Sequence, residues 1–242
     1  MRDSLMEGRE MVQQKLDKKE AFLKLTGGAI ALWGLLSLLG LLISHVLFYG
    51  RIGAWDRHVE VWFAAHRRGS LNTLTGYANA LGGTFSVIGL VIAVLLLFRW
   101  RLRRWDESVI ILTVMLGEVS VFLAVTFTVQ RSRPAVVRLD KSPPTLSYPS
   151  GHTAAALALY GGVAVLLFFI YGRNWKTMLI AVILFALPIL VGISRLYRGM
   201  HFPTDVLAGA LGGGVWMAFA ISVLIPKRIR SEYGRDRTKV LQ

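Results

Sequence analysis

Long apolar runs, separated by short polar stretches, divide this chain from residue 25 onward. A helix needs about 20 apolar residues to cross the hydrocarbon core of a bilayer, and these runs reach or approach that length. We expect six transmembrane helices, at residues 25–49, 77–98, 109–129, 153–171, 177–194 and 204–225. The pattern therefore predicts an all-α, polytopic integral membrane protein.

Polar ends frame this membrane region. We expect a cytoplasmic polar segment over residues 1–24, a six-helix domain over 25–225 and a basic cytoplasmic tail over 226–242. The first apolar run is too long for the hydrophobic region of a cleaved signal peptide, so we expect it to remain as a helix. A hydrophobic content of 54% and a mean hydropathy of +0.53 fit this class.

The net charge of +14 raises the question of nucleic-acid binding, but the basic residues lie in loops and tails beside the apolar runs. With six spans, the face that holds both termini carries eighteen Lys and Arg residues, and the opposite face carries ten. The positive-inside rule then places both termini in the cytoplasm of a cell-membrane protein. We expect membrane lipids as partners, attracted by the basic clusters, and no nucleic acid.

Three short polar strings stand out against the apolar background. They are Arg131-Ser132-Arg133-Pro134, Pro149-Ser150-Gly151-His152, and Ser194-Arg195 followed by His201 and Asp205. In a six-span arrangement the third and fifth loops hold these strings, and both loops lie on the extracytoplasmic face. The sequence thus predicts that all the candidate chemistry meets at one membrane face.

The second string has the features of a loop that leads into a helix. Ser150 is a favoured N-cap residue, and Gly151 lets the backbone approach a ligand closely. Free N–H groups and the positive end of the helix dipole suit a phosphate oxygen, which His152 would then face. A capping turn with a solvated histidine is the structural alternative.

The third string pairs a histidine with a carboxylate. His201 and Asp205 are four residues apart, so on one helical face Asp205 can accept a hydrogen bond from one ring nitrogen and leave the other as a nucleophile. A loop histidine beside an acidic helix start is the alternative. Arg133 has a planar fork that can clamp phosphoryl oxygens, whereas Arg195 can equally be an interfacial arginine whose charged end reaches the headgroups.

Taken together, the strings form a pattern: Arg-x-Arg-Pro, Pro-Ser-Gly-His, then Ser-Arg, five residues, His, three residues and Asp. This pattern resembles the type 2 phosphatidic acid phosphatase family, the lipid phosphate phosphatases related to vanadium haloperoxidases, over residues 118–225. The resemblance implies that His201 takes the phosphoryl group, that Asp205 orients it and that His152 protonates the leaving oxygen. It implies phosphate binding by Arg133, Arg195, Ser150 and the Gly151 N–H, with no metal and no cofactor.

One position departs from the family pattern. The first motif of the family usually begins with a lysine, and the corresponding residue here is Thr126. Arg131 could replace the missing charge, or it could be a structural or exposed residue. This departure keeps open a homologue that binds lipid phosphates without turnover.

Two further features carry less specific signals. Glu118 lies near the middle of the third span, where an ionisable group is costly and needs a partner. It could line the site from below, as a candidate site residue, or form a hydrogen bond between helices. Residues 51–68 carry aromatic residues at helical spacing among basic ones, which predicts an interfacial helix that anchors the chain or walls a lipid tail.

The predicted activity is hydrolysis of a lipid phosphate or diphosphate at the outer leaflet. The family resemblance makes a polyprenyl diphosphate, phosphatidylglycerophosphate and phosphatidic acid the leading substrates, and the outward site favours the polyprenyl diphosphate. A transporter could also use six spans and Glu118, but the paired histidine strings would then be unexplained.

Overall fold

The computed structural model describes residues 2–103, 105–141 and 146–225, and most of this part is helical. The α-helices in chain order are α1 (Arg2–Leu41), α2 (Arg51–Ala65), α3 (Gly69–Leu81), α4 (Thr84–Leu102), α5 (Asp106–Val129), α6 (Gly151–Ala156), α7 (Gly162–Tyr171), α8 (Trp175–Tyr197) and α9 (Pro203–Leu224). A π-helical turn, η1 (Leu42–Val46), and a 3₁₀ turn, η2 (Leu47–Tyr49), extend α1, and the π-helical turn η3 (Leu157–Gly161) joins α6 to α7. No strand occurs in the described part, so the predicted all-α class is confirmed.

Six helical segments of the described residues are long and apolar enough to cross a membrane. They are Lys18–Tyr49, Thr84–Leu102, Asp106–Val129, Gly151–Tyr171, Trp175–Tyr197 and Pro203–Leu224. Each overlaps one predicted span. Large apolar side chains such as Leu96 and Ile189 point outward on α4 and α8, with exposures of 59% and 63%, as expected for a surface that faces lipid.

The second span differs from its predicted bounds of 77–98. Helix α3 ends at Leu81, Gly82 and Gly83 form a turn, and the membrane helix α4 starts at Thr84. Residues 77–81 thus belong to a separate helix, because two consecutive glycines favour a break that the hydropathy of the run does not reveal. The domain division at residue 25 stays a prediction, since α1 runs through it, and residues 226–242 lie outside the described part.

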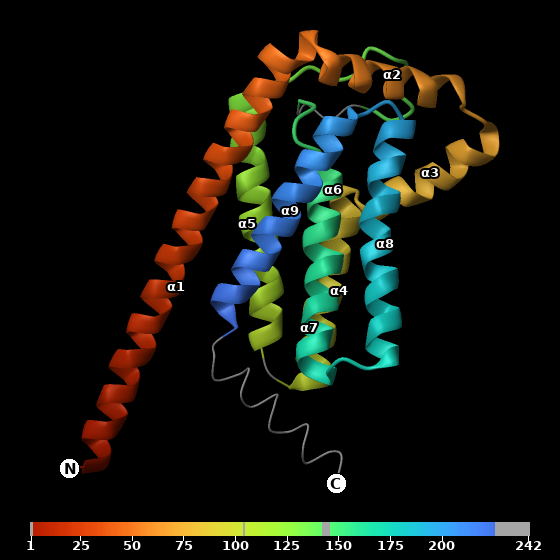
Figure 1. The fold of residues 1–242 in the computed structure, drawn as a ribbon. Coiled ribbons are helices and arrows are strands. Elements are labelled where there is room, and N and C mark those ends of the chain that lie inside the picture. Colours follow the sequence, from red (N-terminus) through yellow and green to blue (C-terminus); the bar gives the residue numbers. More distant parts are fainter. Residues whose placement is uncertain (1, 104, 142–145, 226–242) are drawn as a thin grey trace.

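The helices form a bundle, and one end of this bundle is covered by α2 and the connecting loops (Figure 1). Helix α1 leans against the bundle and starts at the end where α9 finishes, which is the lower end in the view. Helix α2 crosses the opposite end, above the loops that connect α5 to α6 and α8 to α9. The predicted interfacial helix within residues 51–68 corresponds to α2, and its Trp55 and Trp62 are about half exposed.

Small residues allow α9 to pack closely against α6. A Cβ atom at Gly209 would collide with the carbonyl oxygen of Ser150, and one at Gly213 would collide with that of Ala154. The two glycines are four residues apart and lie on the same face of α9, as in the small-residue contacts common between membrane helices. This contact fixes the start of α6 against the first turns of α9.

We expect Gly209→Ala to lower the thermal unfolding midpoint of the protein in detergent. The added methyl meets backbone that cannot rotate away, and overpacking of this kind costs about 1–3 kcal/mol. Gly89→Ala on α4 is the matched control, because a Cβ there meets no atom of the described residues within 4 Å. An equal loss in both variants would assign the effect to helix propensity or handling and not to the α6–α9 contact.

Candidate active site

The second polar string forms the start of α6, and a backbone hydrogen bond ties it to α9. The N–H of Ser150 donates to the carbonyl oxygen of Asp205 at 2.9 Å. Ser150 occupies the N-cap position as expected, but its hydroxyl lies 3.0 Å from Oγ1 of Thr153 and makes no capping hydrogen bond. Gly151 is the first residue of the helix, so the positive end of the helix dipole lies at this loop.

His152 is half-buried in the first turn of α6. The turn between α3 and α4 packs against it, since a Cβ atom at Gly82 would lie 3.0 Å from the His152 carbonyl oxygen. The positive charges of Arg195 and Arg133 are close enough to act on its imidazole. The structure therefore brings His152 together with the other predicted site residues.

His201 is buried, with 4% of its surface exposed, and one ring nitrogen is fixed by the backbone. Nδ1 lies 2.6 Å from the carbonyl oxygen of Ser147, which can only accept a hydrogen bond, so Nδ1 carries the proton. Nε2 keeps its lone pair and lies 3.4 Å from Nη1 of Arg133. Burial, together with the positive charges of Arg195 and Arg133, lowers the pKa of His201 to about 4, so the imidazole is neutral at neutral pH.

The expected hydrogen bond between His201 and Asp205 is not formed. Oδ2 of Asp205 is 3.8 Å from Nδ1 of His201, which is too long for a hydrogen bond. Instead, this oxygen accepts from the Ser147 hydroxyl at 2.5 Å and from the Phe202 N–H at 2.8 Å. Asp205 thus holds the loop whose carbonyl oxygen orients His201, and it acts through Ser147.

Two arginines of the polar strings lie near His201, and each is held by different hydrogen-bond partners. Arg133 donates from Nη1 to the carbonyl oxygen of Met200 at 2.6 Å. Arg195, only 2% exposed, donates from Nη1 to Oδ1 of Asn79 and lies 3.4 Å from Oδ2 of Asp140. Its buried Nε has no hydrogen-bond partner among the described residues. Arg195 is therefore buried and not an exposed interfacial arginine, and its role in phosphate binding stays a prediction.

Four polar residues of this end of the bundle have no place in the predicted site. Asp56 and Asn79 come from α2 and α3, and Asp140 and Ser147 come from the loop before α6. The carboxylate of Asp140 also accepts hydrogen bonds from Nε and Nη2 of Arg198, at 2.7 and 2.6 Å. These bonds attach the loop to α8. Asp56 and Glu60 are acids four residues apart in an otherwise basic interfacial helix, and this spacing is the signal that could have pointed to them.

Arg131 has a structural position. It is 5% exposed, with Nη1 at 2.6 Å from Oδ1 of Asp205 and Nη2 at 2.7 Å from Oδ2 of Asp56. Thr126 is also buried, and its hydroxyl donates to the Tyr148 carbonyl oxygen at 3.2 Å. Both side chains are engaged inside the protein, which favours a structural role for Arg131, and whether Arg131 supplies the missing charge stays a prediction.

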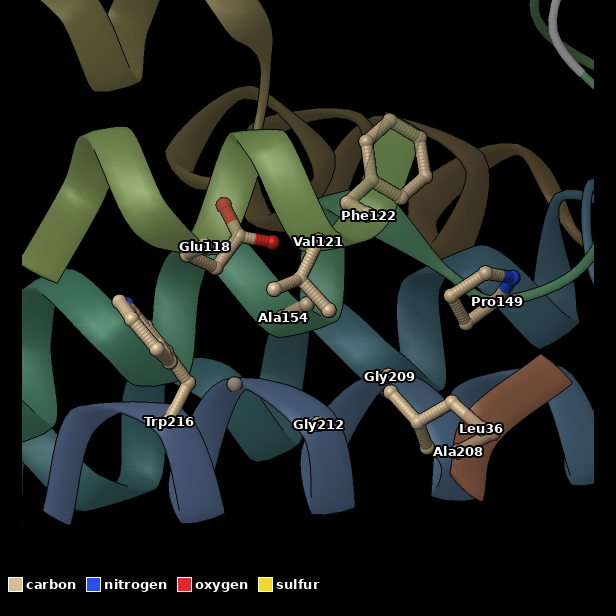
Figure 2. Close-up of a pocket in the computed structure, with 11 residues that line it drawn as sticks. Leu36, Glu118, Val121, Phe122, Pro149, Ala154, Ala208, Gly209, Gly212 and Trp216 are labelled. Carbon is tan, nitrogen blue, oxygen red and sulfur yellow. The ribbon is translucent and has the colours of Figure 1, made fainter. Parts of the chain in front are cut away.

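Glu118 lies deeper in the bundle, on α5, and lines a small cavity beneath the start of α6. In Figure 2, Glu118 and Val121 on α5 face Gly212 and Trp216 on α9 across this cavity. The residue is 3% exposed, and its Oε1 has no hydrogen-bond partner among the described residues. The position agrees with lining the region below the site, and it gives this oxygen no interhelical hydrogen bond. Whether Glu118 takes part in the site stays a prediction.

The part of the chain that holds these residues matches a known protein family. The sequence model of the PAP2 superfamily matches residues 107–229, which include all three polar strings. The chain belongs to the PAP2 superfamily. The family resemblance seen in the motifs is thus confirmed, and the fold agrees with it. The chain is 23% identical, with a TM-score of 0.69, to the crystal structure of the first transmembrane PAP2 type phosphatidylglycerolphosphate phosphatase from Bacillus subtilis, over 78% of this chain and 94% of that one.

Other PAP2 members of similar sequence carry different names. An undecaprenyl-diphosphatase from Sulfolobus acidocaldarius is 35% identical over 130 residues, which are 52% of this chain and 58% of that protein. A lipid A 4'-phosphatase from Bacteroides thetaiotaomicron is 28% identical over 47% of this chain and 57% of its own length. The chain therefore spans somewhat more than half the length of these relatives. Aquifex aeolicus LpxE has a TM-score of 0.53 at 25% identity, over 68% of this chain and 93% of that one.

Proposed function

We propose that this multi-pass membrane protein is a phosphatase that releases phosphate from lipid phosphates and diphosphates through a phosphohistidine at His201. The observation that carries the proposal is the fixed imidazole. Its Nδ1–H is held by the Ser147 carbonyl oxygen, and its Nε2 lone pair faces the guanidinium of Arg133. A neutral, oriented nucleophile beside a cation is what phosphoryl transfer to a side chain requires.

The reaction needs two steps. In the first, Nε2 of His201 bonds to phosphorus while the bond from phosphorus to the leaving oxygen breaks, and His152 gives that oxygen a proton. In the second, His152 takes a proton from water, the water oxygen bonds to phosphorus, and the P–N bond breaks to release inorganic phosphate. Arg133, Arg195, Ser150 and the Gly151 N–H hold the phosphoryl oxygens. We expect that neither step uses a metal or a cofactor.

A polyprenyl diphosphate in the outer leaflet is the substrate that we favour. The Sulfolobus relative, 35% identical over 130 residues, is named for an undecaprenyl diphosphate. Phosphatidylglycerophosphate is the second candidate, supported by the name of a Bacillus subtilis phosphatidylglycerophosphatase B that is 36% identical over 34% of this chain and 40% of its own length. Phosphatidic acid follows from the family resemblance.

The direct test is phosphate release by the purified protein from a panel of these lipids in mixed micelles, without added metal and with a chelator. Samples made with a labelled phosphoryl group and quenched in alkali, where the P–N bond is stable, should contain a labelled histidine. A homologue that only binds lipid phosphates would retain the lipids and release no phosphate. A transporter would give neither released phosphate nor labelled histidine.

The predicted topology can be tested separately. A cysteine in place of Lys141, an exposed residue of the loop before α6, should react with a membrane-impermeant thiol reagent added outside intact cells. A cysteine in place of Lys176, exposed in the first turn of α8, should react only after the cells are permeabilised. The native chain has no cysteine, so this protein adds no background. Labelling of Lys176→Cys alone would place the site on the cytoplasmic side.

A further inference from the structure

A groove of about 410 Å³, lined by both apolar and charged residues, lies beside the candidate active site, within the size range of ligand pockets. One wall comes from the irregular end of α1, the other from α2, and the floor comes from the loop that follows α5. Its lining includes Arg57, Arg131, Arg133 and His45, with Glu60 as the one carboxylate. The groove therefore has an excess of positive charge.

The inner end of the groove adjoins the reacting atoms. Arg133 lines it, and the same Nη1 lies 3.4 Å from Nε2 of His201. Arg131 also lines this end, but its two Nη groups are paired with Asp56 and Asp205, so its charge is balanced inside the protein. A phosphoryl group bonded to His201 would thus lie at the point where the groove begins.

Arg57 lines the groove from α2. Its Nη1 donates to the Phe48 carbonyl oxygen at 3.0 Å, and its guanidinium lies over the Phe48 ring, 4.9 Å from the centroid. No ion pair joins it to Glu60 among the described residues, and Oε1 of Glu60 accepts from the backbone N–H groups of Ala135 and Val136 at 3.0 and 3.2 Å. The groove therefore has a second cationic group, which comes from another element than Arg133.

A lipid chain could leave the groove on its exposed side, next to Tyr49. Tyr49 of η2 lines the groove and is 84% exposed, and Val46 of the preceding turn η1 is 62% exposed. These residues end the first membrane-spanning segment, which runs over Lys18–Tyr49. Exposed residues of this kind at the end of a membrane-spanning segment suit contact with lipid, so we expect a lipid to enter the groove from this side.

We propose that this groove binds the second phosphoryl group of a lipid diphosphate, with Arg57 as a residue that selects diphosphates over monophosphates. This inference rests on the proposed function and names its substrate class. The terminal phosphoryl group would be transferred to His201, the lipid-linked one would lie between Arg133 and Arg57, and the chain would leave past Tyr49. A monophosphate places its only phosphoryl group at His201 and leaves Arg57 unused.

The test compares kcat/KM for a polyprenyl diphosphate and for the monophosphate of the same polyprenol, in the full-length protein. Arg57→Gln should lower the diphosphate-to-monophosphate ratio about tenfold, the effect of one charge-assisted hydrogen bond. Arg57→Lys keeps the charge and should restore most of the ratio. Arg51→Gln, at an exposed arginine in the first turn of α2 outside the groove, is the matched control and should leave the ratio unchanged.

The possible results separate this inference from the proposed function. An unchanged ratio in Arg57→Gln, or an equal fall in Arg51→Gln, would overturn the role of the groove while phosphate release remained intact. If the unmodified protein releases phosphate from neither lipid, the proposed function is overturned. In that case, binding of inorganic diphosphate still decides the role of the groove. Arg57→Gln should weaken it more than binding of inorganic phosphate, and an equal change would overturn the inference.

Discussion

His201→Ala is expected to abolish phosphate release from every lipid phosphate, with a loss of at least about 10⁴-fold in kcat, because no other group can form the bond to phosphorus. The fold should survive. The variant leaves one buried acceptor, the Ser147 carbonyl oxygen, without its donor, which costs about 1–3 kcal/mol. Initial rates in micelles and a thermal unfolding curve of the same preparation measure both effects.

Two other histidine variants serve as comparisons for His201→Ala. His152→Ala should lose about 10²–10⁴-fold, as expected for a general acid, and less with a substrate whose leaving group needs no proton. His66→Ala is the matched control, because His66 is exposed at the end of α2 and stacks on Trp62. Near-normal activity of His201→Ala would show that the nucleophile is another residue, and labelled histidine in that variant would point to His152.

The six spans could be predicted from the sequence because bilayer thickness sets helix length. The meeting of the polar strings at one end of the bundle could also be predicted, because alternate loops lie on the same face. Hydropathy counts apolar residues, and an even number of crossings then fixes which loops share a face. The same reasoning fails at residues 77–81, since two glycines end α3 inside an otherwise continuous apolar run. Local backbone freedom decides that boundary, and hydropathy does not measure it.

The partner of His201 is a different kind of failure. The spacing of four residues to Asp205 predicts a direct hydrogen bond only if both residues are in one helix, whereas α9 begins at Pro203, after His201. The acceptor is a backbone carbonyl oxygen, that of Ser147, and a carbonyl group has no signature in a sequence. Arg195 shows the converse, because an arginine at the end of a span predicts exposure to headgroups unless its buried partners are known.

Arg131 should be the residue of the first string on which stability depends most. Its guanidinium joins two carboxylates that are both fully buried, Asp56 on α2 and Asp205 on α9. Removing one partner of a buried ion pair costs about 3–5 kcal/mol, because a charge is left without compensation. We therefore expect Arg131→Ala to lower the thermal unfolding midpoint by roughly 10 °C for a protein of this length, and to lose activity as α2 detaches from α9.

Arg133→Ala is the matched control, two residues further along the same loop. Arg133 is half-buried and donates to a backbone carbonyl oxygen, so its loss should reduce kcat/KM strongly while the unfolding midpoint shifts by much less. Combining Arg131→Met with Asp56→Asn removes both charges of one pair and should recover part of the stability lost in Arg131→Met alone. A stable Arg131→Ala with a selective defect in phosphate binding would mean that Arg131 supplies the charge missing at Thr126. In that case the ion pairs with Asp56 and Asp205 would contribute little to holding α2 over the site.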